Sequence, residues 1–224
     1  IIISCKYNYD MIQFNQITDI KEIHKANKVH IQTELKEKNP IIVHNLLSNY
    51  DSLKHISIES LNKSEPGYII KDNQKLIALD KFITSDQMFI HNNTSMISEF
   101  NLESDLNTCS DYFHDKLSCN IKHYLSIYKG NHSISCNKNK HNVTLLHQIY
   151  NQSIIYLINP KHTEDIKGKS TEEIKKWSSK LMLDSGQILY IPTEWFYFYE
   201  TKDTSIIVTT MSDNYFTCIF NTLR

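Results

Sequence analysis

The spacing of hydrophobic and polar positions changes near residue 121. Before it, segments with helical spacing alternate with short apolar runs, which is typical of a mixed α/β region. We expect strands over Pro40–His44, Leu76–Leu79 and Gln87–His91, and helices over Ile20–Glu37, Leu53–Leu61 and Leu102–Leu117, with a helical turn from Asp80. The first part of the chain is therefore expected to combine helices with a few strands.

From residue 121 onward the pattern is one of repeated short apolar segments separated by turn residues. We expect strands over Ile121–Tyr128, Val143–Tyr150, Ser153–Ile158, Gln187–Ile191, Trp195–Glu200, Thr204–Met211 and Tyr215–Phe220. One helix, Thr171–Leu181, interrupts them, and Ser170 or Thr171 with Glu173 close behind suits its N-terminal cap. Many short strands after a helical first part favour an antiparallel sandwich or barrel.

Composition and length fit one globular unit. The chain has 224 residues, of which 40% are hydrophobic and 22% charged, and it contains no internal repeat. We expect a single domain over residues 1–224, with an α/β annex and outer strands over 1–120 and a barrel core over 121–224.

The charge pattern gives no support to nucleic-acid binding. The formal net charge is -1, and the lysines are scattered among acidic residues rather than clustered. Arg224 is the only arginine, so bidentate guanidinium contacts are almost absent. The excess of Asn, Ile, Lys and Tyr indicates an AT-rich genome, such as that of a large DNA virus or an AT-rich protist.

Cysteine usage favours a reducing compartment. The five cysteines are odd in number and form no CxxC pair, which argues against a disulfide framework or a zinc site; they are Cys5, Cys109, Cys119, Cys136 and Cys218. A bridge between Cys109 and Cys119 stays open. No segment reaches the roughly 20 apolar residues that span a bilayer, and a leader or membrane anchor ahead of Ile1 also stays open.

Two segments resemble the JmjC/cupin-like family. Residues Leu145–Pro160 are similar to the family pattern Q-I-x-G-x-K-x-x-x-L-x-x-P, and Leu183–Tyr197 to G-D-x-L-Y-I-P-x-x-W-W-H. Asn39–Asn45 resembles the strand that opens these domains, and Thr204–Thr209 falls where their closing strand falls. The resemblance implies an α+β, mainly β fold: a double-stranded β-helix (a cupin or jelly-roll barrel) with an N-terminal helical and strand annex.

The resemblance also implies a place for a metal centre. Active members of the family are iron(II) and 2-oxoglutarate-dependent oxygenases, which bind iron through H-x-D/E on one strand and a later histidine, and leave positions open for co-substrate and oxygen. In this sequence the H-x-D positions fall on Lys138-Asn139-Lys140 or on Cys136-Asn137-Lys138, depending on the register. The distal histidine falls on Tyr197, and the lysine that binds 2-oxoglutarate falls on Ser153.

Neither register supplies a histidine followed two places on by a carboxylate. A lysine ammonium at these positions would repel Fe²⁺, and a phenol with a pKa near 10 is a poor ferrous ligand. We therefore assign no catalytic, cofactor-binding or metal-ligating residue and expect no cofactor. An alternative metal site built from His132, His141 or His147 stays open. Trp195, Tyr197 and Tyr199 alternate onto one strand face, either as a ligand pocket or as filling of the former cavity, and we favour filling.

These observations predict a catalytically inactive JmjC/cupin-like domain that serves as a protein-binding or structural module. Its partner is expected to be a protein or peptide, including a second copy of the chain. The alternatives are an oxygenase with atypical ligands such as His141 or His147, a small-ligand-binding barrel, and an assembly subunit of a virion or complex.

Overall fold

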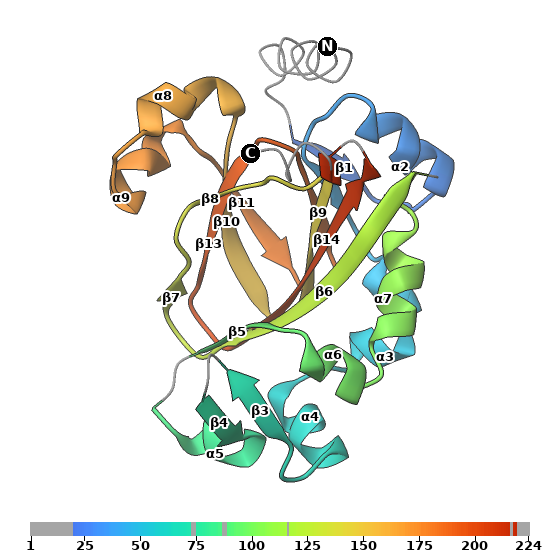
Figure 1. Ribbon diagram of the computed structural model, residues 1–224, viewed down its shortest axis with the longest axis vertical. Coiled ribbons are helices and arrows are strands. Elements are labelled where there is room, and N and C mark those ends of the chain that lie inside the picture. Colours follow the sequence, from blue (N-terminus) through green and yellow to red (C-terminus); the bar gives the residue numbers. More distant parts are fainter. Residues whose placement is uncertain (1–19, 73–74, 87–88, 116, 216, 219–224) are drawn as a thin grey trace.

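The computed structural model describes residues 20–72, 75–86, 89–115, 117–215 and 217–218. Within them the chain is a mixed α/β, β-rich protein whose strands form antiparallel sheets (Figure 1). The strands are β1 (Lys21–Ile23), β2 (Ile41–Val43), β3 (Ile69–Asp72), β4 (Lys75–Ala78), β5 (Phe89–Asn93), β6 (Ser118–Tyr128), β7 (His132–Ser133), β8 (Asn137–Lys138), β9 (Val143–Tyr150), β10 (Gln152–Ile158), β11 (Ser179–Asp184), β12 (Ile188–Pro192), β13 (Phe196–Thr201) and β14 (Ser205–Asn214).

Helices are short and most of them precede β6. The α-helices are α2 (Lys28–Leu35), α3 (Asp51–Lys54), α4 (Ile58–Ser64), α5 (Leu79–Thr84), α6 (Ser95–Glu99), α7 (Glu103–Ser110), α8 (Thr163–Ile166) and α9 (Thr171–Ile174). The 3-10 helices are η1 (Leu47–Asn49), η2 (Pro160–His162) and η3 (Lys175–Trp177). No helix in the described ranges is long and apolar enough to cross a membrane.

Two sheets carry the fold. The larger has the strand order β1-β2-β12-β9-β14-β6-β5, and all its pairs are antiparallel except β1 with β2. The smaller has the order β11-β10-β13-β7, with β8 also paired to β13. A separate hairpin, β3–β4, completes the strands. The described strands form no closed barrel, because each sheet ends in edge strands.

The pairing from β6 onward is nested around the β10–β11 connection. β10 pairs with β11, β9 pairs with β12, β7 and β8 pair with β13, and β6 pairs with β14. Successive pairs alternate between the sheets: β10–β11 and the pairs of β13 with β7 and β8 lie in the smaller sheet, whereas β9–β12 and β6–β14 lie in the larger. This places the connection after Tyr150 between the two sheets, where Asn151 adopts a left-handed φ of 55° that asparagine tolerates better than most residues.

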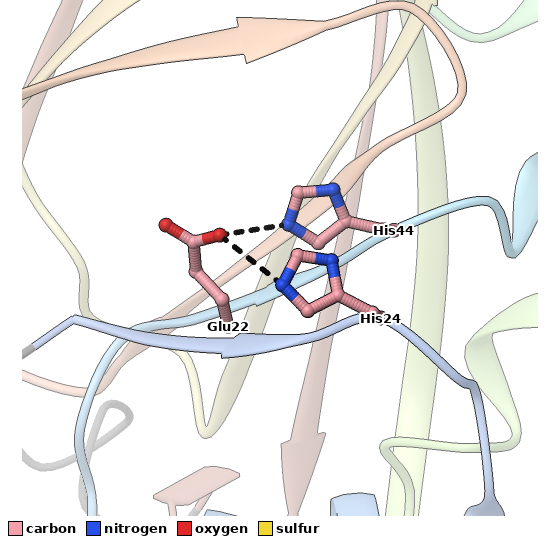
Figure 2. A group of neighbouring side chains, drawn as sticks. All are labelled: Glu22, His24 and His44. Atoms are coloured by element: carbon pink, nitrogen blue, oxygen red, sulfur yellow. Dashed lines mark hydrogen bonds and ion pairs between the residues drawn. The ribbon is translucent and has the colours of Figure 1, made fainter.

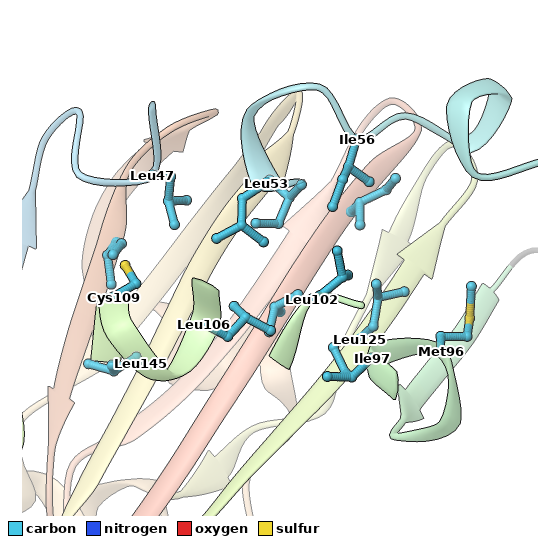
Figure 3. Packing of buried hydrophobic residues seen from close by; sticks show 14 of the residues in the cluster. Leu47, Leu53, Ile56, Met96, Ile97, Leu102, Leu106, Cys109, Leu125 and Leu145 are labelled. Atoms are coloured by element: carbon cyan, nitrogen blue, oxygen red, sulfur yellow. The ribbon is translucent and has the colours of Figure 1, made fainter. Parts of the chain in front are cut away.

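Three hydrophobic clusters pack the faces of the two sheets. In the first, α3, α6 and α7 pack on one face of the larger sheet, where Leu53 and Leu106 meet Leu125 and Leu145 (Figure 3). The second lies between the two sheets and includes Leu146, Ile155, Leu189 and Ile207. The third lies on the outer face of the smaller sheet beneath α8 and α9. Because both faces of the larger sheet are covered, β9 is buried along almost its whole length rather than alternating.

Several expected strands are confirmed by the structure. Those over Pro40–His44, Leu76–Leu79, Ile121–Tyr128, Val143–Tyr150, Ser153–Ile158, Gln187–Ile191, Trp195–Glu200 and Thr204–Met211 correspond to β2, β4, β6, β9, β10, β12, β13 and β14. The expected helical turn at Asp80 is α5. Ser170 caps α9, with reciprocal hydrogen bonds to Glu173. Of the expected strand Gln87–His91, residues 87–88 lie outside the described ranges, and Phe89 begins β5.

Other expectations are wrong, because tertiary pairing overrides local spacing. Ile20–Glu37 is not one helix: Lys21–Ile23 forms β1 beside β2, and only Lys28–Leu35 is helical. The expected helix Thr171–Leu181 ends as an α-helix at Ile174, and Ser179–Asp184 forms β11 because it pairs with β10.

Two further helices are shorter than expected, and one expected strand is helical in the residues that the structure describes. The Leu53–Leu61 segment is divided because Ser57 caps a new helix, α4. Helix α7 covers only part of Leu102–Leu117. Within the expected strand Tyr215–Phe220, the described residues Tyr215, Thr217 and Cys218 are helical, and residues 216, 219 and 220 lie outside the described ranges.

Candidate functional site

Tyr197, at the expected distal-ligand position, lies in the cluster between the two sheets. Residues Trp195, Tyr197 and Tyr199 all belong to this cluster and are buried, so they do share one face of the strand. The Tyr199 hydroxyl lies 2.9 Å from the Tyr128 hydroxyl, and the two rings meet edge to face. Burial raises the pKa of Tyr197 to about 12. The phenol therefore stays neutral at physiological pH and is a poor metal ligand.

Lys138 lies opposite Phe196 on the paired strands β8 and β13. Its ammonium forms an ion pair with Glu194, whose side chain is 4% exposed, and lies 5.5 Å from the centre of the Phe196 ring. Cys136 packs with Phe196 on the outer cluster of the smaller sheet. In the register Cys136-Asn137-Lys138, the first and third side chains are therefore on the face away from Tyr197.

In the other register, Lys138-Asn139-Lys140, the central residue Asn139 is buried and stabilises the loop between β8 and β9 through hydrogen bonds. It is 2% exposed; its side-chain amide donates to the Ile191 carbonyl, and its Oδ1 accepts from the Thr144 hydroxyl, both at 2.8 Å. Its backbone N–H donates to the Trp195 carbonyl, and its carbonyl accepts from Glu194 N–H. These bonds hold Glu194 in a left-handed conformation, with φ of 73°, which is uncommon for glutamate.

Ser153, at the expected co-substrate position, belongs to a buried polar group. Its hydroxyl lies 3.1 Å from that of Ser205, which accepts at 2.8 Å from the side-chain amide of Gln148. All three residues are almost fully buried. A hydroxyl has no positive charge to bind the carboxylate of an organic acid, so this position offers hydrogen bonding alone.

His132, His141 and His147 do not converge on one centre. His132 stacks on Tyr128 with ring centres 5.0 Å apart. His141 Nδ1 lies 3.2 Å from the Asp213 carboxylate. His147 is fully buried, and its Nε2 lies 2.9 Å from the Thr210 hydroxyl. His147 lies on the helix-covered face of β9, two residues from Leu145, whereas Leu146 faces the inter-sheet cluster.

A different group of residues, Glu22, His24 and His44, has the spacing of metal ligands (Figure 2). Their ligand atoms all lie within 4.8 Å of one another, and this is the only such group of three or more found in the described part of the chain. Glu22 Oε2 lies 3.1 Å from His44 Nε2 and 3.7 Å from His24 Nε2. The two imidazoles stack with centres 4.3 Å apart.

This group is not among the residues predicted from the sequence. Its local signal is Glu22-Ile23-His24, because residues two apart share a face of a strand. The expected helix over Ile20–Glu37 would instead have rotated these two side chains far apart around its axis. The third residue, His44, directly follows β2, and the parallel register that places Ile23 beside Val43 brings it next to His24. That pairing is not visible in the sequence.

The open question of a Cys109–Cys119 bridge is answered by the structure. Both are free, and Cys109 is a fully buried residue of α7. The Sγ of Cys119 lies 3.7 Å from the Sγ of Cys218 instead.

Compared with models of known protein families, the chain matches none, and a search of curated proteins also gives no match.

Proposed function

We propose that this chain is a single-domain double-stranded β-helix protein that lacks the metal centre of the JmjC/cupin-like family and serves as a protein-binding or structural module. The nested strand pairing supports the fold. Counting β7 and β8 as one interrupted strand, eight strands run from β6 to β14. The first, third, sixth and eighth lie in one sheet and the others in the second, as in a jelly roll.

The observation that carries the functional part is the packing around Tyr197. Its ring belongs to a continuous apolar cluster with Leu157, Leu189 and Ile191. In addition, the Lys138 ammonium is paired with Glu194 beside the same strand. Neither group suits ferrous iron, because the Lys138 side chain is engaged in an ion pair with a carboxylate and a neutral phenol is a weak ligand; burial raises the pKa of Tyr197 to about 12 and so keeps it neutral.

The hairpin β3–β4 supplies a surface that suits a protein partner. Ile69 pairs with Ala78 and Lys71 with Leu76, so Ile69, Lys71 and Leu76 share one face. Ile69 is 54% exposed and Leu76 is 69% exposed, while Ile70 on the opposite face is fully buried. Apolar side chains grouped on an exposed face are typical of interaction sites.

The test of inactivity is 2-oxoglutarate decarboxylation by the purified chain with added Fe²⁺ and ascorbate. We expect no turnover above that of a Tyr197→Phe variant, which preserves the packing but removes the hydroxyl. Turnover that is lost on substitution of His141 or His147 would instead establish an oxygenase with atypical ligands.

The test of binding is chemical crosslinking in cells that express the chain. We expect specific crosslinked partners to be lost when Ile69 and Leu76 are both replaced by serine, and to be retained in the matched variant Val29→Ser, which removes an equally exposed residue of α2. Retention of all partners in the double variant would exclude the hairpin as the contact surface.

One observation favours the alternative of a small-ligand-binding barrel. The indole Nε1 of Trp195 is buried and has no hydrogen-bond partner among the described residues, and such a donor is costly unless a ligand or solvent accepts from it. A thermal-shift screen with organic acids, nucleotides and sugars tests this alternative, because a ligand that binds only the native state raises the melting temperature.

A further inference from the structure

We propose that Glu22, His24 and His44 form a surface site for a divalent transition-metal ion, with Zn²⁺ as the representative cation and at least one coordination position left to solvent. Glu22 lies in β1, whereas His24 and His44 directly follow β1 and β2 at one edge of the larger sheet, and the three side chains point toward one another (Figure 2). Such an ion would be bound independently of the position of Tyr197.

The ligand set fits this class of cation. Two imidazoles and one carboxylate are a common ligand combination for zinc when a fourth position is open to water. Imidazole nitrogen favours Zn²⁺, Ni²⁺ or Cu²⁺ over Mg²⁺ or Ca²⁺, which take oxygen ligands. The site is also accessible, because Glu22 is 54% exposed and His24 is 74% exposed. An incoming ion therefore displaces little packed structure.

The strand geometry partly organises the ligands before an ion arrives. Glu22 and His24 are two residues apart on β1 and the segment that follows it, which gives them the same face. His44 follows β2 in the parallel register and is only 19% exposed. The His44 backbone N–H also donates to the Ile23 carbonyl at 2.9 Å, which fixes the two chains beside each other.

The hydrogen bonds around His44 define its metal-free state. The side-chain amide of Gln187 donates to His44 Nδ1 at 3.1 Å, and Gln187 Oε1 accepts at 2.8 Å from the Asp184 backbone N–H. Nδ1 is thus an acceptor, so neutral His44 carries its proton on Nε2 and donates it to Glu22.

Metal binding requires the other tautomer. An ion at Nε2 takes that lone pair, and the proton moves to Nδ1, where it needs an acceptor. Gln187 can accept it through Oε1 only if its amide turns over, which gives up the bond from Asp184 N–H. Replacing Gln187 by glutamate removes this conflict, because one carboxylate accepts from both Asp184 N–H and His44 Nδ1–H.

The location separates this site from the family centre. Gln187 precedes β12, and His44 lies beside it, because Ile188 at the start of β12 pairs with Val43. Lys138 and Tyr197 lie near the opposite end of β12, which finishes at Pro192. A cation here would join β1 to β2 at the sheet edge. It would therefore stabilise the edge of the sheet rather than act on the interior.

The experiment is Zn²⁺ titration of the full chain in competition with a chromophoric chelator, supported by Co²⁺ absorption spectra. We expect one Zn²⁺ per chain and an intense Co²⁺ band typical of four-coordinate geometry. His24→Gln, which changes an exposed side chain and preserves the core, should weaken binding at least ~10-fold, as should Glu22→Gln. Gln187→Glu should strengthen binding by about 10-fold to 100-fold, the usual contribution of a carboxylate that orients a ligating histidine.

The matched control is His30→Gln on α2. His30 lies 3.6 Å from Glu34, so it is also an exposed histidine beside a carboxylate, but without a third ligand. We expect this variant to bind Zn²⁺ like the wild type. The proposal is overturned if Zn²⁺ does not bind stoichiometrically, if His30→Gln weakens binding as much as His24→Gln does, or if Gln187→Glu has no effect on affinity.

Discussion

Two buried histidines, His123 and His147, are linked through the hydroxyl of Thr210, and the hydrogen bonds determine where their protons lie. His123 Nε2 lies 3.0 Å from the side-chain amide oxygen Oδ1 of Asn107, so Nε2 carries the proton and Nδ1 is an acceptor. The Thr210 hydroxyl, 2.8 Å away, therefore donates to His123 Nδ1 and accepts from His147 Nε2. His147 Nδ1 is left as a lone pair with no hydrogen-bond partner among the described residues.

This arrangement predicts a loss of stability in acid. Burial lowers the pKa of His147 to about 3 and that of His123 to about 4, with a smaller contribution from neighbouring histidines. An unfolded histidine titrates near 6.5, so between about pH 6.5 and 4 the unfolded state binds more protons than the folded state. As the pH is lowered through this range, the free energy of unfolding should therefore decrease by about 1.4 kcal/mol per pH unit for each histidine. Urea unfolding at pH 7, 6 and 5 measures this slope.

The variant His123→Gln tests the assignment. Between pH 6 and 5, the free energy of unfolding of this variant should change with pH as if nearly one proton fewer were taken up on unfolding. This holds whatever the effect of the substitution on stability at pH 7. His30→Gln, on the exposed side of α2, is the matched control. An unchanged slope in His123→Gln would contradict the neutral buried state inferred for this residue.

Among the elements, α5 ends against the ammonium of Lys129, which comes from outside the helix. Lys129 Nζ donates to the carbonyls of Phe82 and Ser85 at 2.6 and 2.7 Å, at the C-terminal end of α5. It also lies 4.6 Å from the centre of the Phe82 ring. A cation at this end compensates the unpaired carbonyls and the negative end of the helix dipole.

We expect Lys129→Met to destabilise α5. The change removes these charge-assisted bonds, at a cost of about 1–3 kcal/mol, while the aliphatic part of the side chain remains. Amide hydrogen exchange should increase over Leu79–Thr84, and the urea midpoint should fall. Lys122→Met, at an exposed position of β6, should change neither measurement. Equal protection of α5 in both variants would show that Lys129 is not required.

Element by element, the sequence predicts best where one strand is long and apolar. Segments such as Val143–Tyr150 were identifiable because burial on both faces demands an unbroken apolar run. β1 was not identifiable, since its three residues form a strand only because β2 lies beside them. β11 was missed for the same reason: its exposed residues gain their ladder from β10.

At the scale of the whole molecule, the last described residues lie beside the start of β6. Cys218 Sγ lies 3.7 Å from Cys119 Sγ, although 99 positions separate them in the sequence. Neither cysteine forms a disulfide, and both are partly accessible. Small side-chain rotations would bring the sulfurs to bonding distance, which is about 2.05 Å in a disulfide.

We therefore expect oxidised glutathione to join Cys119 to Cys218. One cysteine thiolate forms a mixed disulfide and releases reduced glutathione, and the second displaces another, which gives the intramolecular bond. Closing so long a loop should stabilise the chain by up to about 4 kcal/mol. Peptide mapping identifies the bond, and urea unfolding measures its effect.

Two variants separate this bond from general oxidation. Cys218→Ser should abolish both the bond and the stabilisation, whereas Cys136→Ser should preserve both. A bond that forms with Cys136 instead would contradict the contact between β6 and the segment after β14.

The sequence by itself determined which residue types occupy the positions of the expected metal centre. It also determined most strands after residue 121, because apolar runs and turn residues are local signals. Only the tertiary structure decided that the side chains of Cys136 and Lys138 point away from Tyr197, because the side of the sheet that each side chain occupies depends on the register of β8 against β13. It also decided that Glu22, His24 and His44 meet, because a parallel pairing across 20 residues leaves no periodic signal in the chain.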